Sequence, residues 1–78
     1  MQLNDVPEGA KVKVLSFKGG AQFYNRLASM GICEKSLIKI VKNPGYGPLV
    51  IQCEGKRFGM GRGMAEKIKV EKEEVGNG

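Results

Sequence analysis

The chain has 78 residues, a formal net charge of +5 and no histidine. A domain of this size has a small core and little material for a water-excluding cleft, and the usual general base near neutral pH is missing, so we expect no enzyme. Residues 1–70 carry 12 Lys and Arg against 5 Asp and Glu, whereas residues 71–78 carry 1 against 3. This excess of positive charge favours an acidic partner, although a solvated coat of lysines explains it equally well.

Hydrophobic periodicity predicts a mainly β chain with one short helix. Strands are indicated where apolar and polar residues alternate, and the helix where the apolar spacing changes to three and four residues. In chain order the predicted elements are a strand at 11–17, a helix at about 22–30, strands at 36–43, 49–53 and 56–60, a helical turn within 61–67 and a strand at 68–70. Glu54 and Gly55 predict a tight hairpin turn. These short strands predict a small, strongly bent barrel.

The predicted helix has one apolar face. Phe23, Leu27 and Met30 lie at helical spacing, and Gly31 follows where a left-handed C-terminal cap is expected. We expect Phe23 and Leu27 to face the core and Arg26 to point outward, because a buried unpaired arginine is costly. The side of the helix on which Met30 lies is left open.

A single domain is predicted at residues 1–71, followed by a flexible, charged and glycine-containing tail at residues 72–78. The N-terminal region lacks the apolar run that a signal peptide or a membrane span requires, so we expect an intracellular protein. Thiols inside cells usually stay reduced, and Cys33 and Cys53 both stand beside apolar residues. We therefore expect the two cysteines to be small core or half-buried residues.

The chain carries no motif for catalysis, metal binding or cofactor binding. Its acids and serines are scattered singly, and Cys33 and Cys53 lack the further ligands of a zinc site, although they would be the nucleus of one. The glycine run at residues 59–64 lacks the third glycine of a dinucleotide-binding motif and instead allows a strand to bend past its neighbour. We expect no catalytic residue, no metal and no cofactor.

A small basic RNA-binding barrel is the alternative function. Residues 9–20, a strand followed by glycines, are similar to the start of small RNA-binding barrels in ribosome-associated proteins. Proteins that bind single strands place aromatic side chains within a basic groove. The aromatic residues of this chain are spread out instead, and only Tyr46 is expected to be exposed. We therefore do not expect nucleic acid as the main partner.

Four motifs in order resemble the ferrous iron transport protein A (FeoA) family over residues 3–70. They are "LNDVPEGAKVKV", "RL..MGI" at 26–32, "GPLVIQCEGKRFGM" and "R..A..I.V" at 62–70. The resemblance implies an SH3-like barrel and a non-catalytic accessory of bacterial ferrous iron uptake. Two positions depart from the family pattern. Lys35 replaces a frequent glycine, so its turn has another type or carries strain, and Gly63 stands where a charged residue is frequent.

The family resemblance also implies a partner, the cytoplasmic GTPase region of a ferrous iron permease, whose activity or assembly the protein would modulate. The protein would then be cytoplasmic, at the inner membrane face through its partner, with no membrane insertion of its own, and a weak homo-oligomer stays open. We expect the helix and the turn at residues 62–66 to flank the binding face. The candidate residues are Tyr24, Arg26, Met30, Tyr46 and Arg62.

Overall fold

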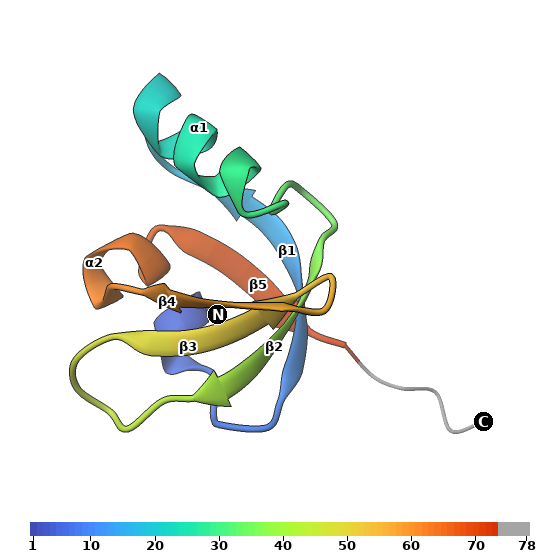
Figure 1. The fold of residues 1–78 in the computed structure, drawn as a ribbon, viewed down its shortest axis with the longest axis vertical. Helices are drawn as coiled ribbons and strands as arrows, with labels where there is room; N and C mark the ends of the chain where they lie inside the picture. Colours follow the sequence, from blue (N-terminus) through green and yellow to red (C-terminus); the bar gives the residue numbers. More distant parts are fainter. Residues whose placement is uncertain (74–78) are drawn as a thin grey trace.

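A computed structural model describes residues 1–73 of the chain (Figure 1). The strands form one antiparallel sheet with the order β4-β3-β2-β1-β5. The elements are η1 (Leu3–Asp5), β1 (Lys11–Phe17), α1 (Ala21–Ser29), β2 (Leu37–Lys42), β3 (Leu49–Cys53), β4 (Lys56–Met60), α2 (Arg62–Ala65) and β5 (Ile68–Lys72). The predicted mainly β class, the helix after the first strand and the helical turn before the last strand are confirmed.

Two differences concern the ends of the chain. The sequence did not predict the 3-10 turn η1, which buries Leu3 beside the sheet. The last strand is longer than predicted, because β5 continues to Lys72 and the backbone N–H of Glu73 still donates to Lys11 O at 2.9 Å. The rest of the predicted tail, residues 74–78, lies outside the described residues.

The core lies on the inner face of the bent sheet. Alternation places Val12 and Val14 of β1 inside, and the inward positions of the other strands are apolar in the same way. The buried side chains are Leu3, Val6, Val12, Val14, Leu27, Ile32, Ile38, Ile40, Leu49, Ile51, Cys53, Met60, Ala65, Ile68 and Val70. None of the described polar or charged residues is buried with them. Each large apolar side chain contributes about 1.5–3 kcal/mol through burial.

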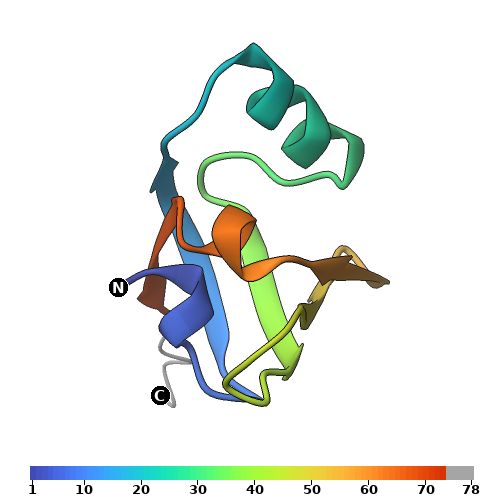
Figure 2. The ribbon, with the colours of Figure 1, turned by 90° about the vertical axis from the view of Figure 1, so that its left-hand side faces the viewer.

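Irregular pairing bends the sheet around this core. The register between β1 and β5 shifts between Val14 and Ser16, and that between β2 and β3 shifts between Ile40 and Lys42. An extra residue at such a bulge bends its strand and increases the local twist. The strands therefore wrap around the core, while α1 stands beyond one end of the sheet (Figure 2).

Residues with positive φ close three tight turns. Glu54 and Gly55 have φ values of 53° and 79°, so the predicted hairpin turn between β3 and β4 is confirmed and has two left-handed residues. Gly31 ends α1 at φ 79°, as predicted. Lys35 has φ 74°, a conformation that costs a residue with a Cβ atom about 1–2 kcal/mol. The expected strain in that turn is therefore present at Lys35.

Candidate partner-binding site

Helix α1 is held to the core by few side chains. Leu27 is its only fully buried residue, whereas Phe23 is half-buried and packs against the margin of the core. Met30, which follows the helix, is also half-buried against the core, so its position is no longer open. Arg26 is exposed, as expected. The helix thus covers one end of the core and leaves most of its surface free.

A groove of about 430 Å³ separates α1 from α2. Its lining residues are Gln22, Phe23, Arg26, Gly61, Gly63, Met64 and Lys67, and we call it the α1–α2 groove. Phe23 and Met64 supply apolar surface, whereas Arg26 and Lys67 supply two positive charges, and no acid lines it. Lys67 Nζ lies 5.7 Å from the centroid of the Phe23 ring, a cation–π distance. The groove therefore combines apolar contact with uncompensated positive charge.

A second hollow, of about 450 Å³, lies on the opposite side of α1 and is partly aromatic. Tyr24 is 46% exposed, and its ring meets that of Phe17 edge-on, with the centroids 4.6 Å apart. Cys33 lines the same hollow and is exposed, so the expectation of a core or half-buried position was wrong for this residue. The turn after α1 carries Cys33 outward, where its Sγ lies 3.4 Å from Ser36 Oγ.

Cys53, in contrast, is buried at the end of β3, as expected. Its thiol donates to Gly31 O at 3.8 Å, directly below the end of α1. Burial raises the pKa of this thiol above its ordinary value of 9.0, and the nearby charges of Glu54 and Cys33 add to the rise. The raised pKa lowers the fraction of reactive thiolate below that of an ordinary cysteine, as is typical of a core residue.

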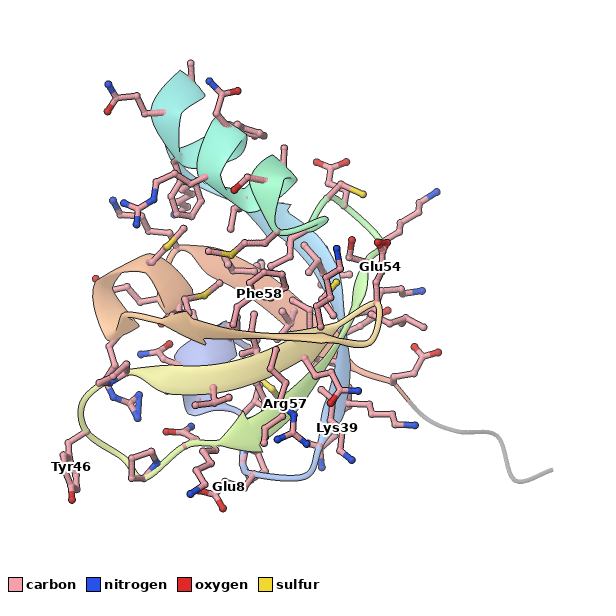
Figure 3. All side chains as sticks on the ribbon, in the orientation of Figure 1. Glu8, Lys39, Tyr46, Glu54, Arg57 and Phe58 are labelled. Carbon is pink, nitrogen blue, oxygen red and sulfur yellow. The ribbon has the colours of Figure 1, made fainter. Side chains whose placement is uncertain are left out.

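Tyr46 lies at the end of the molecule away from α1, and the side chain of Arg62 contacts the base of its loop. Tyr46 is 76% exposed on the loop between β2 and β3 and points away from the body in Figure 3. The guanidinium of Arg62 is half-buried and donates to Asn43 Oδ1 and, at 3.3 Å, to Asn4 O. Arg62 therefore positions the loop that carries Tyr46, and α2 reaches the α1–α2 groove through Met64 and its glycines instead.

Asn43 fixes the base of this loop and was not singled out in the sequence. Its Nδ2 donates to Val6 O at 2.8 Å and to Asn4 O at 3.2 Å, while its backbone N–H donates to Glu8 Oε2 at 2.8 Å. Its Oδ1 accepts from Gly45 N at 3.2 Å, which forms an Asx turn. An asparagine before Pro-Gly predicts that turn, but the sequence gives no signal for the bonds to η1.

The five candidate residues therefore form two groups rather than one face. Tyr24, Arg26 and Met30 belong to the α1 end, and Tyr46 and Arg62 to the loop end. Within residues 1–73, no three His, Cys, Asp or Glu side chains are grouped as a metal site would require. Among the same residues, no helix has the length and apolar character to span a bilayer.

The bent antiparallel sheet, with a helix after its first strand and a helical turn before its last, defines the class of small SH3-like β domains. The model of one family, described as the FeoA domain, matches residues 1–72. This chain therefore belongs to the FeoA family, which is associated with Fe(2+) transport, and the sequence resemblance is confirmed.

Individual relatives agree with this assignment. A Methanocaldococcus jannaschii protein named as an Fe(2+) transport protein A is 41% identical over 69 residues, which cover 88% of this chain and 83% of that protein. A crystal structure of an iron uptake regulatory protein (FeoA) superposes with a TM-score of 0.88 at 30% identity, covering 92% of this chain and 96% of that chain. A manganese-dependent transcriptional repressor shares the fold alone, with a TM-score of 0.84 at 21% identity over 92% of this chain and 36% of the repressor chain.

Proposed function

We propose that this protein is a cytoplasmic, non-catalytic accessory of ferrous iron uptake, which binds the GTPase region of the Fe(II) transporter and modulates its activity or assembly. Membership of a family associated with Fe(2+) transport supports the proposed role in ferrous iron uptake. The two hollows beside α1 support a binding role rather than a chemical one, because one is lined by two cations without an acid and the other by one acid without a cation.

The α1–α2 groove is the observation that carries the binding proposal. An arginine beside a desolvated apolar surface is a frequent anchor of protein interfaces, and Arg26 stands beside Phe23 and Met64 in this way. Lys67 adds a second positive charge to the groove. The complementary partner surface has an apolar side chain that enters the groove and a carboxylate that meets Arg26.

Tyr24 and Met30 extend this contact along α1, on the two sides of the buried Leu27. Tyr46 provides a separate contact at the loop end, held in place by the bonds of Arg62 to the loop and to η1. We assign the principal interface to the α1 end, because the hollows on both sides of the helix lie there, whereas Tyr46 projects singly.

The proposal is tested by titrating this protein with the purified cytoplasmic GTPase region of the Fe(II) permease from the same organism. Arg26→Ala is expected to weaken binding by at least about tenfold, the effect of losing an interface anchor. The matched control is Arg57→Ala, an exposed arginine on β4 that lies well away from α1 in Figure 3. The control is expected to change the affinity by less than about twofold.

Circular dichroism and melting curves establish that both variants keep the fold. An unchanged affinity of Arg26→Ala would overturn the role of the α1–α2 groove. No binding of the unmodified protein to the GTPase region would overturn the proposed partner.

A further inference from the structure

A hollow rich in lysine lies beside the N-terminal segment and shares one lining residue, Lys67, with the α1–α2 groove. It measures about 460 Å³, within the range of small-ligand sites. Its lining residues are Met1, Gln2, Ser16, Lys18, Glu66, Lys67 and Lys69, and we call it the lysine hollow. Three of these side chains carry a positive charge, whereas only Glu66 carries a negative one. The hollow is therefore a concave site with an excess of positive charge.

Backbone hydrogen bonds hold the three lysine positions together. Lys18 N donates to Lys67 O at 2.9 Å, which joins the end of β1 to the start of β5. An isolated bridge pairs Gln2 with Lys69, so that the N-terminal segment lies along β5 (Figure 2). The lysine side chains thus project from a paired backbone and not from an unattached loop, which favours a defined site.

The bulge in β1 adds a hydroxyl group to the same site. With strict alternation, Ser16 would face the core like Val14, two residues earlier. The register shift instead sets Ser16 opposite Lys69, whose side chain is exposed on the outer face. Ser16 is exposed as well and lines the lysine hollow. Bulges commonly re-aim a side chain in this manner beside functional sites.

The three lysines of the lysine hollow form no ion pair with a carboxylate of the described residues, although Lys67 lies over the ring of Phe23. Among residues 1–73, the ion pair that forms is Lys13 with Glu71, at 3.6 Å, and none involves Lys18, Lys67 or Lys69. Like charges gathered in one depression repel each other, and the repulsion is relieved when an anion enters. The arrangement therefore favours the binding of a small anion.

The donors match a phosphate group better than a carboxylate. A phosphate monoester carries nearly two negative charges and three strong acceptor oxygens, which correspond to the three ammonium groups. The hydroxyl of Ser16 can donate a further bond. We propose that the lysine hollow binds a phosphate group, either of a small soluble phosphate compound or of a phospholipid headgroup.

Nuclear magnetic resonance tests the soluble form of the ligand. The full chain, labelled with nitrogen-15, is titrated with pyrophosphate while sodium chloride keeps the ionic strength constant. We expect saturable shifts of the amide signals of residues 16–18 and 67–69, with the other amides unchanged. Shifts that spread over the whole surface without saturation would overturn binding of pyrophosphate at this site.

Two double variants remove the same total charge from different places. Lys18→Gln with Lys69→Gln is expected to weaken pyrophosphate binding by at least about tenfold, because two charge-assisted contacts are lost. Lys39→Gln with Lys42→Gln, on the exposed positions of β2, is the control and is expected to change it by less than about twofold. An equal loss in both would show non-specific attraction and overturn the proposal. Lys67 is left unchanged because it also lines the α1–α2 groove.

Sedimentation with vesicles distinguishes the two sources of the phosphate group. Vesicles of phosphatidylglycerol with phosphatidylcholine are compared with vesicles of phosphatidylcholine alone. Binding that requires phosphatidylglycerol and is lost in Lys18→Gln with Lys69→Gln supports a headgroup. Saturation by pyrophosphate without vesicle binding supports a soluble phosphate compound, and failure of both probes overturns the site. These variants leave Arg26 intact, so the outcome is separate from that of the transporter titration.

Discussion

The two ends of the molecule are attached to the core by different kinds of contact. Helix α1 is anchored by apolar packing, with Leu27 fully buried, and its N-cap Gly20 supplies no side-chain hydrogen bond. The loop between β2 and β3 has no buried residue from Asn43 to Pro48, but polar bonds to η1 and α2 hold its base. Apolar packing tolerates small shifts, whereas hydrogen bonds lose energy steeply with misalignment. The helix can therefore adjust to a partner, while the loop presents Tyr46 from a fixed base.

The largest effect is expected at the apolar anchor of α1. Leu27→Ala should lower the free energy of unfolding by about 2–5 kcal/mol, because it leaves a cavity between the helix and the sheet. Urea unfolding followed by circular dichroism measures the change. The matched control is Leu37→Ala, since Leu37 is 55% exposed on β2. This substitution should lower the free energy of unfolding by no more than about 0.5 kcal/mol.

Equal effects at Leu27 and Leu37 would contradict the anchoring of α1 by one buried side chain. If Leu27→Ala does not fold, Leu27→Met is the milder test of the same contact. It should cost less than about 1.5 kcal/mol, because the apolar volume is nearly kept.

A smaller effect is expected at the polar anchor of the loop. Asn43→Ala removes the bonds to Val6 O, Asn4 O and Arg62, so the free energy of unfolding should fall by about 1–3 kcal/mol. Tyr46→Ala, three residues further on, should cost no more than about 0.5 kcal/mol, since its side chain is mostly in solvent. Urea unfolding measures both. If Tyr46→Ala lowered the free energy of unfolding as much as Asn43→Ala, the loop would be held by its tip and not by its base.

The smallest expected effect is a loss of stability at alkaline pH. It arises from the thiol of Cys53, which is buried below the end of α1. Burial raises the pKa of Cys53 in the folded state above its ordinary value of 9.0. The folded protein therefore keeps the thiol proton at a pH where the unfolded chain loses it. The stabilising contribution is complete below about pH 9 and is lost as the pH rises through the folded pKa.

The free energy of unfolding, measured by urea at several pH values, should consequently fall in alkaline solution. Cys53→Ala is expected to lower stability at neutral pH but to reduce this alkaline decline. Cys33→Ala removes an exposed thiol and should reduce the decline much less than Cys53→Ala does, because Cys33 is the smallest cause of the raised pKa. A decline of the same size in Cys53→Ala would show that the thiol is not its source.

Local patterns predicted most of the fold. Alternation located the strands, and Leu27 and Gly31 located the buried face and the end of α1, because these features depend on neighbours in the sequence. The outward turn of Ser16 was not predictable, since it arises from a register shift against β5, a distant segment. The same reason explains Cys33, whose apolar neighbours suggested burial while the turn after α1 carries it outward.

The candidate site was predicted less well than the fold. Arg26 is exposed as expected, and Tyr24 is exposed as well, although Tyr46 was the only aromatic residue expected to be so. The turn at residues 62–66 lines the α1–α2 groove together with α1, but the guanidinium of Arg62 donates to Asn43 Oδ1 and Asn4 O instead of lining the groove. Such a contact joins residues far apart in the chain and has no periodic signal. The lysine hollow could not be predicted from the sequence for the same reason, since strand pairing is what brings Lys18 and Lys69 together.

The strand order also has a consequence for the protein at high concentration. Strand β4 ends the sheet on one side, and no other strand among residues 1–73 pairs with its outer edge, so its outer backbone groups could pair with another chain. Lys56 and Arg57 begin this strand, and both are exposed. Their like charges repel an approaching copy of the same edge. The basic character of the chain thereby also protects it against aggregation through its open edge.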